Sequence, residues 1–206
     1  MSSTVNNFPD RLDHRIIYDA IASGARVLDL GCGTGELLYH LVRNKQARVQ
    51  GIEMDQKAVY ECVKRGLSVF QGDIETGLVE FPDGSFDDVI INQCLQEVRK
   101  VDFVIEESLR VGKRVIVGFP NFAHFTSRLM LAWEGRSPVT AALPYLWYDT
   151  PNVRFLSIKD FQIFCAEKRL RVISAHFLGK KGTVTCWPNL MALNAVFILT
   201  KVKEGG

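Results

Sequence analysis

The stretch Val27-Leu-Asp-Leu-Gly-Cys-Gly-Thr-Gly-Glu36 decides the fold of this chain. A short apolar run ends in glycines at alternate positions, Gly31, Gly33 and Gly35, and a helical pattern follows. Glycine lets the backbone approach a ligand closely and lets a strand turn sharply into a helix. An open α/β sheet builds its nucleotide site in this way, at the carboxyl end of its first strand. The stretch therefore predicts a site for a nucleotide-like cofactor.

The composition is that of a globular protein, and it narrows the choice of partners. The 206 residues are 47% hydrophobic with a net charge of +2, which indicates one domain and no nucleic-acid or membrane partner. No apolar run approaches the roughly eighteen residues that a membrane helix needs. The five cysteines are scattered without CxxC pairing, which is typical of a reduced cytoplasmic protein. No Cys/His cluster has metal-ligand spacing, so we expect no metal site.

Strand-like and helix-like segments alternate along most of the chain, which predicts βαβ units around a mostly parallel sheet. The pattern predicts strands near residues 26–30, 48–52, 67–71, 87–92, 114–118, 170–178 and 195–202, and helices near 11–22, 36–43, 56–65, 101–109 and 158–168. We therefore expect a seven-stranded α/β sheet with helices on both faces and an antiparallel edge strand. One domain over residues 1–206 is expected, with an aromatic-rich, cap-like insertion at about 121–156.

Glu36 helps to identify the cofactor. The dinucleotide fingerprint is G-x-G-x-x-G/A, but here the third glycine comes one residue early and Glu36 takes the place of the last small residue. A pyrophosphate at this helix start would meet a carboxylate, which is unfavourable. S-adenosylmethionine has no phosphate and carries an ammonium and a sulfonium. The loop therefore favours S-adenosylmethionine, or S-adenosylhomocysteine, over a nicotinamide dinucleotide.

Polar residues at successive strand ends supply the acceptors that this ligand needs. Glu53 ends the second strand, where an acid can accept both ribose hydroxyls, and Asp73 follows the third, where it can take the adenine amino group. Asp29 could face the ammonium. The complete set expected to contact the cofactor is Asp29, Gly31, Cys32, Gly33, Gly35, Glu53, Met54, Asp73, Ile74, Asn92 and Gln93. Asp73 as a helix cap and Glu53 as a solvated strand end are the structural alternatives.

Several further stretches resemble one family, the methionine biosynthesis protein MetW, a branch of the class I methyltransferases with a Rossmann-like fold. They are Leu12-Asp-His-Arg15, Arg26-Val-Leu-Asp-Leu-Gly-Cys-Gly33, Gly51-Ile-Glu-Met-Asp55, Asp83-Gly-Ser-Phe-Asp87, Leu109-Arg-Val-Gly112, Gly118-Phe-Pro-Asn-Phe122, Leu143-Pro-Tyr-Leu-Trp-Tyr-Asp-Thr-Pro-Asn152 and Pro188-Asn-Leu190. The sequence departs from the family pattern at Ala123, Phe125 and Arg154, all in the insertion. The family's substrate and partner are therefore the properties that the resemblance carries over to this chain least directly.

The resemblance implies a cytoplasmic protein of methionine biosynthesis that acts with a homoserine O-acyltransferase. Two functions follow from it. The first is an S-adenosylmethionine-dependent methyltransferase acting on a small molecule. The second is a non-catalytic accessory subunit that binds and activates the acyltransferase, because a methyltransferase fold alone does not establish turnover.

The insertion contains the candidates for the methyl-acceptor side. Methyl transfer is an in-line displacement that depends mainly on alignment and exclusion of water. His124 could act as a base, and Tyr145 and Tyr148 could contact the acceptor, although each has an ordinary structural interpretation. The residues that follow the fourth strand, Asn92-Gln-Cys-Leu95, lack the Asp/Asn-Pro-Pro-aromatic motif of base amino methylation. The sequence therefore argues against a nucleic-acid substrate.

Overall fold

The computed structural model describes residues 11–140 and 142–202. The elements are α1 (Leu12–Ala20), β1 (Arg26–Leu30), α2 (Glu36–Lys45), β2 (Arg48–Glu53), α3 (Gln56–Lys64), β3 (Val69–Gln71), α4 (Ile74–Gly77), η1 (Leu78–Glu80), β4 (Phe86–Asn92), η2 (Leu95–Glu97), α5 (Val101–Val111), β5 (Gly112–Pro120), α6 (Phe125–Leu129), η3 (Met130–Glu134), α7 (Ile158–Glu167), β6 (Leu170–Leu178), α8 (Pro188–Met191) and β7 (Asn194–Lys201). The two ends of the predicted domain and residue 141 of the predicted insertion lie outside the described residues.

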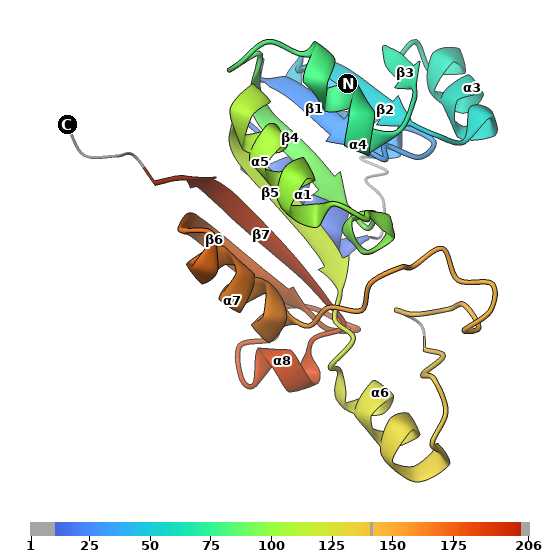
Figure 1. The fold of residues 1–206 in the computed structure, drawn as a ribbon. Coiled ribbons are helices and arrows are strands. Elements are labelled where there is room, and N and C mark those ends of the chain that lie inside the picture. The colour runs from blue at the N-terminus through green and yellow to red at the C-terminus, as the bar shows by residue number, and fades with distance from the viewer. Residues whose placement is uncertain (1–10, 141, 203–206) are drawn as a thin grey trace, which may run out of the picture.

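The seven strands form one sheet in the order β3-β2-β1-β4-β5-β7-β6 (Figure 1). The pairs among β1 to β5 are parallel, whereas β7 runs antiparallel to both of its neighbours. The expected class I methyltransferase sheet is confirmed. The antiparallel strand, however, lies one place inside the edge, and β6 forms the edge. Consistent with these positions, β7 is almost wholly buried, whereas β6 is partly exposed.

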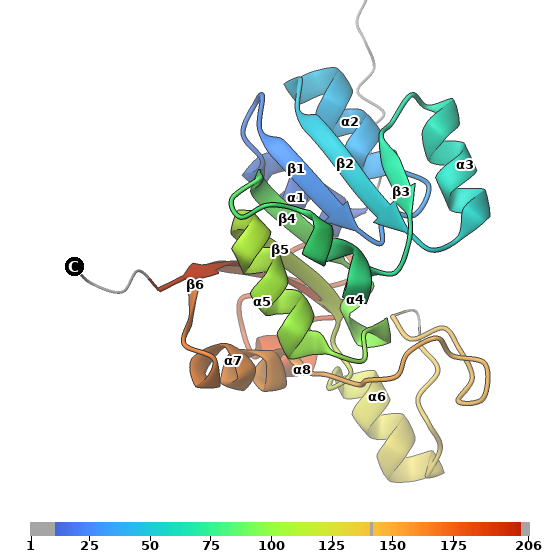
Figure 2. The same ribbon diagram turned by 45° about the horizontal axis from the view of Figure 1, so that its top comes forward.

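Two layers of helices cover the sheet (Figure 2). On one face, α1 and α2 pack on alternate residues of the strands, among them Val27, Ile90 and Ile116. On the other face, α5 and α7 pack on the residues between these, such as Leu28 and Val89. Strand side chains alternate between faces, so strands buried on both sides read as continuous apolar runs. Because the faces are covered, a ligand has access mainly at the strand ends.

The chain leaves the sheet between β5 and α7, over residues 121–157, and we call this segment the insertion. It holds the short α6 and the π-helical turn η3, which the sequence pattern did not predict. In Figure 1 it is the yellow and orange segment beyond the carboxyl ends of β4 and β5. None of the helices within residues 11–140 and 142–202 has the length and apolar character needed to cross a bilayer.

Asn121 fixes the start of the insertion. This residue is 1% exposed, and its Nδ2 donates to the carbonyls of Ala192 (2.8 Å) and Asn189 (3.2 Å). Its Oδ1 accepts from the backbone N–H of Ala123 (3.2 Å) and of Ile158 (3.4 Å). One buried amide therefore joins the end of β5 to the start of α7 and to α8.

Candidate functional site

The glycine loop between β1 and α2 has the backbone that its sequence requires. Gly31, Gly33 and Gly35 have φ of 73°, 54° and 72°, a region that favours glycine. A Cβ on Gly35 would lie 2.5 Å from Leu67 Cδ1 and 2.7 Å from Cys62 Sγ. Gly35 therefore lets the start of α2 pack closely against Cys62 and Leu67. The loop stays close to the strand ends.

Glu53 holds the glycine loop in place from the end of β2. Its Oε2 accepts a hydrogen bond from the backbone N–H of Gly33 at 2.8 Å. Its Oε1 accepts from the N–H groups of Met54 (2.8 Å) and Asp55 (2.9 Å). The carboxylate is thus fixed by three donors rather than being a free strand-end charge.

A cavity of about 580 Å³ lies beside this carboxylate, and we call it the glycine-loop cavity. Its lining residues are Gly31, Glu53, Met54, Gly72, Asp73, Ile74, Glu75, Gln93, Cys94, Glu97, Val98 and Arg99. Six of the residues that we expected around a cofactor lie in this wall: Gly31, Glu53, Met54, Asp73, Ile74 and Gln93. Asp73 also caps α4 through its Oδ1, which accepts from Glu75 N–H at 2.8 Å. Its second oxygen has no hydrogen bond to a described residue.

The other expected cofactor residues are not among the lining residues of this cavity. Gly33 and Gly35 form the loop backbone. The Sγ of Cys32 would be 2.6 Å from a Cβ on Gly51, so this thiol fills the space below the loop. Asp29 is 4% exposed and lines neither this cavity nor the one described below. Contact of these residues with a cofactor stays a prediction.

Asp29 has an unusual protonation state. Burial raises the pKa of its carboxyl to about 8, and the negative charge of nearby Glu53 adds to the rise, while Arg11 opposes it. The carboxyl is therefore largely protonated at neutral pH. A cation arriving beside the pair formed by Asp29 and Glu53 would favour its ionised form.

Asn92, expected in the cofactor set, connects β4 to α1. Its Nδ2 donates to Asp13 Oδ2 at 2.9 Å, and Arg11 donates to both oxygens of Asp13 at 3.2 and 2.6 Å. Burial alone would raise the pKa of Asp13, but the hydrogen bonds and charge of Arg11 outweigh it and lower the pKa. A Cβ on Gly118 would lie 2.0 Å from Asn92 Oδ1, so the neighbouring strand leaves room for this amide only because it has glycine there.

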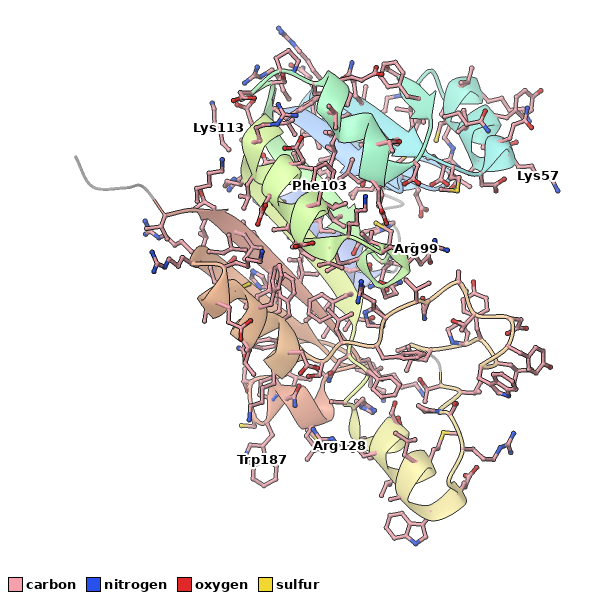
Figure 3. The ribbon with its side chains drawn as sticks, viewed as in Figure 1. Lys57, Arg99, Phe103, Lys113, Arg128 and Trp187 are labelled. Carbon is pink, nitrogen blue, oxygen red and sulfur yellow. The ribbon has the colours of Figure 1, made fainter. Side chains whose placement is uncertain are left out.

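A second cavity, of about 560 Å³, lies between the strand ends and the insertion, and we call it the insertion cavity. Its lining residues are Arg11, Leu12, Asp13, Gln93, Gln96, Glu97, Pro120, Ala142, Pro144, Tyr145, Asn152, Leu178, Gly179, Lys180, Leu193 and Asn194. Gln93 and Glu97 line both cavities, which therefore adjoin each other. Figure 3 shows Arg99, from the wall of the glycine-loop cavity, on the side of the sheet that faces the insertion.

The three candidates for the acceptor side have different surroundings. Tyr145 lines the insertion cavity. His124 lines neither cavity and caps α6, with its Nδ1 at 2.7 Å from Thr126 Oγ1, and burial lowers its pKa. Tyr148 is 67% exposed and packs edge-on against Trp147. His124 therefore caps the start of α6 through Nδ1, and its role as a base stays a prediction.

Sequence reasoning missed Asp13, Gln96 and Glu97. Asp13 was within one of the family stretches but had no assigned role. Gln96 and Glu97 lie in the short turn η2, where no periodicity indicates which side chain faces a cavity. An acid a few residues after the fourth strand was the one available signal. Among residues 11–140 and 142–202, no group of three His, Cys, Asp or Glu side chains is arranged to hold a metal ion.

Comparison with known proteins identifies relatives that match most of this chain. The chain matches the family model of the methionine biosynthesis protein MetW over residues 11–199. It is 38% identical over 159 residues to the bifunctional methionine biosynthesis protein MetXA/MetW of Rhodopirellula baltica, a match covering 72% of this chain and 25% of the relative. The chain thus spans about a quarter of that relative's length.

Solved structures share the fold at low sequence identity. A SAM-dependent methyltransferase from Archaeoglobus fulgidus has a TM-score of 0.67 at 17% identity, with 93% of this chain and 91% of that chain covered. A SAM-dependent methyltransferase from Thermotoga maritima, described as a possible histamine N-methyltransferase, has a TM-score of 0.66 at 18% identity, with 92% and 88% covered. These likenesses concern the fold.

Proposed function

Because the chain belongs to the methionine biosynthesis protein MetW family, we propose that it binds S-adenosylmethionine in the glycine-loop cavity and methylates a small molecule in the insertion cavity. The observation that carries this proposal is the adjoining pair of cavities at the carboxyl edge of the sheet, with Gln93 and Glu97 in both walls. The edge is where ligands bind in open α/β folds.

The wall of the glycine-loop cavity has the chemistry that this ligand requires. Glu53 can accept from the ribose hydroxyls, the free oxygen of Asp73 can accept from the adenine amino group, and Ile74 can pack on the ring. The wall contains four carboxylates and one guanidinium, so its charge suits a cation: Glu53, Asp73, Glu75, Glu97 and Arg99. When bound, S-adenosylmethionine supplies a methyl group activated by its sulfonium.

The contribution of the chain itself is alignment and exclusion of water. The carbonyl of Gln96 accepts from the N–H groups of Val153 and Arg154, each at 3.0 Å, which ties the insertion to η2. The guanidinium of Arg154 also donates to the carbonyls of Val98 and Arg99. These bonds keep the insertion over the strand ends, where an acceptor would be held against the methyl group.

The Glu53→Gln variant tests the donor site. Glutamine keeps the size and one acceptor oxygen but loses the charge that faces the ribose and the sulfonium. We expect S-adenosylmethionine affinity to fall by about 1–3 kcal/mol, in line with the loss of a charged hydrogen-bond partner. Isothermal titration calorimetry measures this, with Glu61→Gln as the matched control because Glu61 lies on the exposed face of α3. Unchanged affinity in Glu53→Gln would contradict the proposed ribose contact.

A second candidate function is supported by the fused relative. The relative's name joins MetXA and MetW in one chain, which favours a physical association between the two activities. In this reading the chain binds a homoserine O-acyltransferase and changes its rate, with S-adenosylmethionine as a bound signal. Co-purification and the acyltransferase rate on mixing test it, and the absence of a complex at micromolar concentration would count against it.

A further inference from the structure

The wall of the insertion cavity carries four charged side chains, and two of them neutralise each other. Arg11 and Asp13 form a two-point ion pair, with Nη2 at 2.6 Å from Oδ2. Glu97 and Lys180 also line the cavity, but neither side chain forms a hydrogen bond or an ion pair with any residue in the described part of the chain. One negative and one positive charge therefore remain available to a ligand.

These two charges come from distant parts of the sheet. Glu97 ends η2, which follows β4, and Lys180 follows β6. The strand order β4-β5-β7-β6 puts three strand spacings between the ends of those two strands, or roughly 14 Å. Glu97 is also in the wall of the glycine-loop cavity. The negative charge thus lies next to the proposed methyl donor, and the positive charge lies toward the far side of the cavity.

Gln96 gives an independent indication of a ligand beside Glu97. It is 6% exposed and lines the insertion cavity. Its Nε2 donates to the carbonyl of Gln93 at 2.7 Å, which fixes the orientation of the amide. Its Oε1 is buried and has no hydrogen-bond donor among the described residues. Buried acceptors are nearly always paired, so a ligand that brought a donor to this oxygen would be favoured here.

We propose that the insertion cavity binds an amino-acid-like zwitterion, whose amine lies against Glu97 and Gln96 and whose anionic group lies toward Lys180. The inference rests on the proposed function and identifies its substrate class. An ammonium has three N–H donors, which matches a carboxylate and an amide oxygen on one wall. A carboxylic acid, sulfonate or phosphate at the other end would pair with the lysine.

The same arrangement assigns Glu97 a catalytic role. An ammonium has no lone pair, so the bound amine must lose a proton before it can attack. That proton passes from nitrogen to the Glu97 carboxylate, and the nitrogen lone pair then forms the new N–C bond. The C–S bond of the donor breaks, and its electrons stay on sulfur. Burial and the charge of Glu53 raise the pKa of Glu97, which favours its acceptance of the proton.

Binding of three simple probes tests the proposed charges. The probes are 6-aminohexanoate, hexylamine and hexanoate, titrated by calorimetry into protein saturated with S-adenosylhomocysteine. We expect 6-aminohexanoate to bind at least tenfold more tightly than either singly charged probe. With S-adenosylmethionine in place of S-adenosylhomocysteine, mass spectrometry should detect N-methylated 6-aminohexanoate.

Two variants separate the two ends of the cavity. Glu97→Gln should weaken both amine probes at least tenfold, abolish methylation and leave hexanoate as tight or tighter. Lys180→Met should weaken 6-aminohexanoate and hexanoate but not hexylamine. Lys181→Met is the matched control, because Lys181 does not line the cavity.

The outcomes distinguish this inference from the proposed function. Protein that binds S-adenosylhomocysteine but shows no preference for the amine probes would overturn the zwitterion assignment alone. Equal affinity of Glu97→Gln and the unmodified protein for hexylamine would do the same. Protein that does not bind S-adenosylhomocysteine would remove the proposed function, and this inference with it.

Discussion

Asp29 makes the free energy of unfolding depend on pH. Its pKa is about 8 in the folded chain because of burial and the nearby charge of Glu53, compared with 3.8 for an unperturbed carboxyl. Below pH 4 both the folded and the unfolded states hold the proton, so the group has no effect. Between about pH 4 and pH 8 only the folded state holds it, so ionisation stabilises the unfolded chain increasingly as pH rises. Above pH 8 the effect is constant.

The Asp29→Asn variant should remove this dependence. We expect the free energy of unfolding of the unmodified protein to fall between about pH 5 and pH 8, and the slope to become smaller in Asp29→Asn. Urea titrations at several pH values measure this. Asp19→Asn serves as the control because Asp19 is exposed on α1. Equal slopes in the unmodified protein and Asp29→Asn would show that the carboxyl is ionised in the fold.

Gly35 is a second residue whose substitution has a defined cost. Alanine there adopts a φ of 72° and meets Leu67 and Cys62 at 2.5 and 2.7 Å. The backbone and packing effects together should reduce the free energy of unfolding by about 2–4 kcal/mol. Gly66→Ala is the matched control, since Gly66 has a φ of 74° and no atom within 4 Å of a Cβ, and should cost only about 1 kcal/mol from its left-handed backbone. Chemical denaturation compares the two variants, and equal losses would exclude the packing contribution.

The glycine loop shows why some residues could be predicted from sequence and others could not. Gly31 and Glu53 were recognised because the loop and the strand-end acid are local signals with fixed spacing. Whether a side chain faces a cavity depends on tertiary packing, so the sequence could not show that the Cys32 thiol packs against Gly51. That Glu97 lines both cavities could not be predicted for the same reason, because the turn η2 has no repeat that indicates direction.

Among the helices and strands, too, those with a local sequence pattern could be predicted and those set by tertiary packing could not. The strands and long helices were predicted because alternating apolar patterns reflect burial on both faces of the sheet. The predicted third strand, 67–71, shortens to Val69–Gln71 at the sheet edge beyond β2, where little of it is buried. The order of β6 and β7 could not be predicted, because both strands are largely apolar and no local signal indicates which of them takes the edge. The insertion is fixed by contacts between distant residues, which sequence periodicity does not encode.

Asn121 is the contact that most constrains the insertion. Asn121→Ala leaves the carbonyls of Asn189 and Ala192 and the N–H groups of Ala123 and Ile158 without this side chain. We expect a loss of about 2–4 kcal/mol in the free energy of unfolding, because each buried group left unpaired costs about 1–3 kcal/mol and some find new partners.

Asn189→Ala provides the matched comparison for Asn121→Ala. The side chain of Asn189 accepts one bond, from the N–H of Lys159 at 3.1 Å, at an exposed position. Its loss should cost less than about 1 kcal/mol. Chemical denaturation of both variants measures the difference. If Asn121→Ala were no less stable than Asn189→Ala, the buried amide would not anchor the insertion.

At the scale of the whole molecule, the carboxyl edge of the sheet and the outer side of the insertion differ in their chemistry. The carboxyl edge of the sheet carries the two cavities and most of the charged groups discussed above. The outer side of the insertion instead exposes large aromatic side chains, with Trp133 and Trp147 at 79% and 74% exposure. Exposed tryptophans are enriched in protein interfaces. Donor binding and association with a partner protein should therefore be separable by substitution.

The double variant Trp133→Ser/Trp147→Ser tests this separation. If the insertion binds a homoserine O-acyltransferase, the loss of two aromatic contacts should weaken the complex at least tenfold, since interface tryptophans often contribute about 2 kcal/mol or more. Affinity for S-adenosylmethionine should stay within twofold, because neither residue lines the glycine-loop cavity.

Tyr60→Ser is the control for this experiment. Tyr60 is 60% exposed on α3, near the β3 edge of the sheet and far from the insertion in Figure 1. Surface-plasmon binding of the acyltransferase and calorimetric titration of S-adenosylmethionine compare the three proteins. An equal loss of partner affinity in Tyr60→Ser would indicate binding through general surface hydrophobicity. Full partner affinity in the double variant would instead place the interface elsewhere on the chain and leave the insertion with the small-molecule role alone.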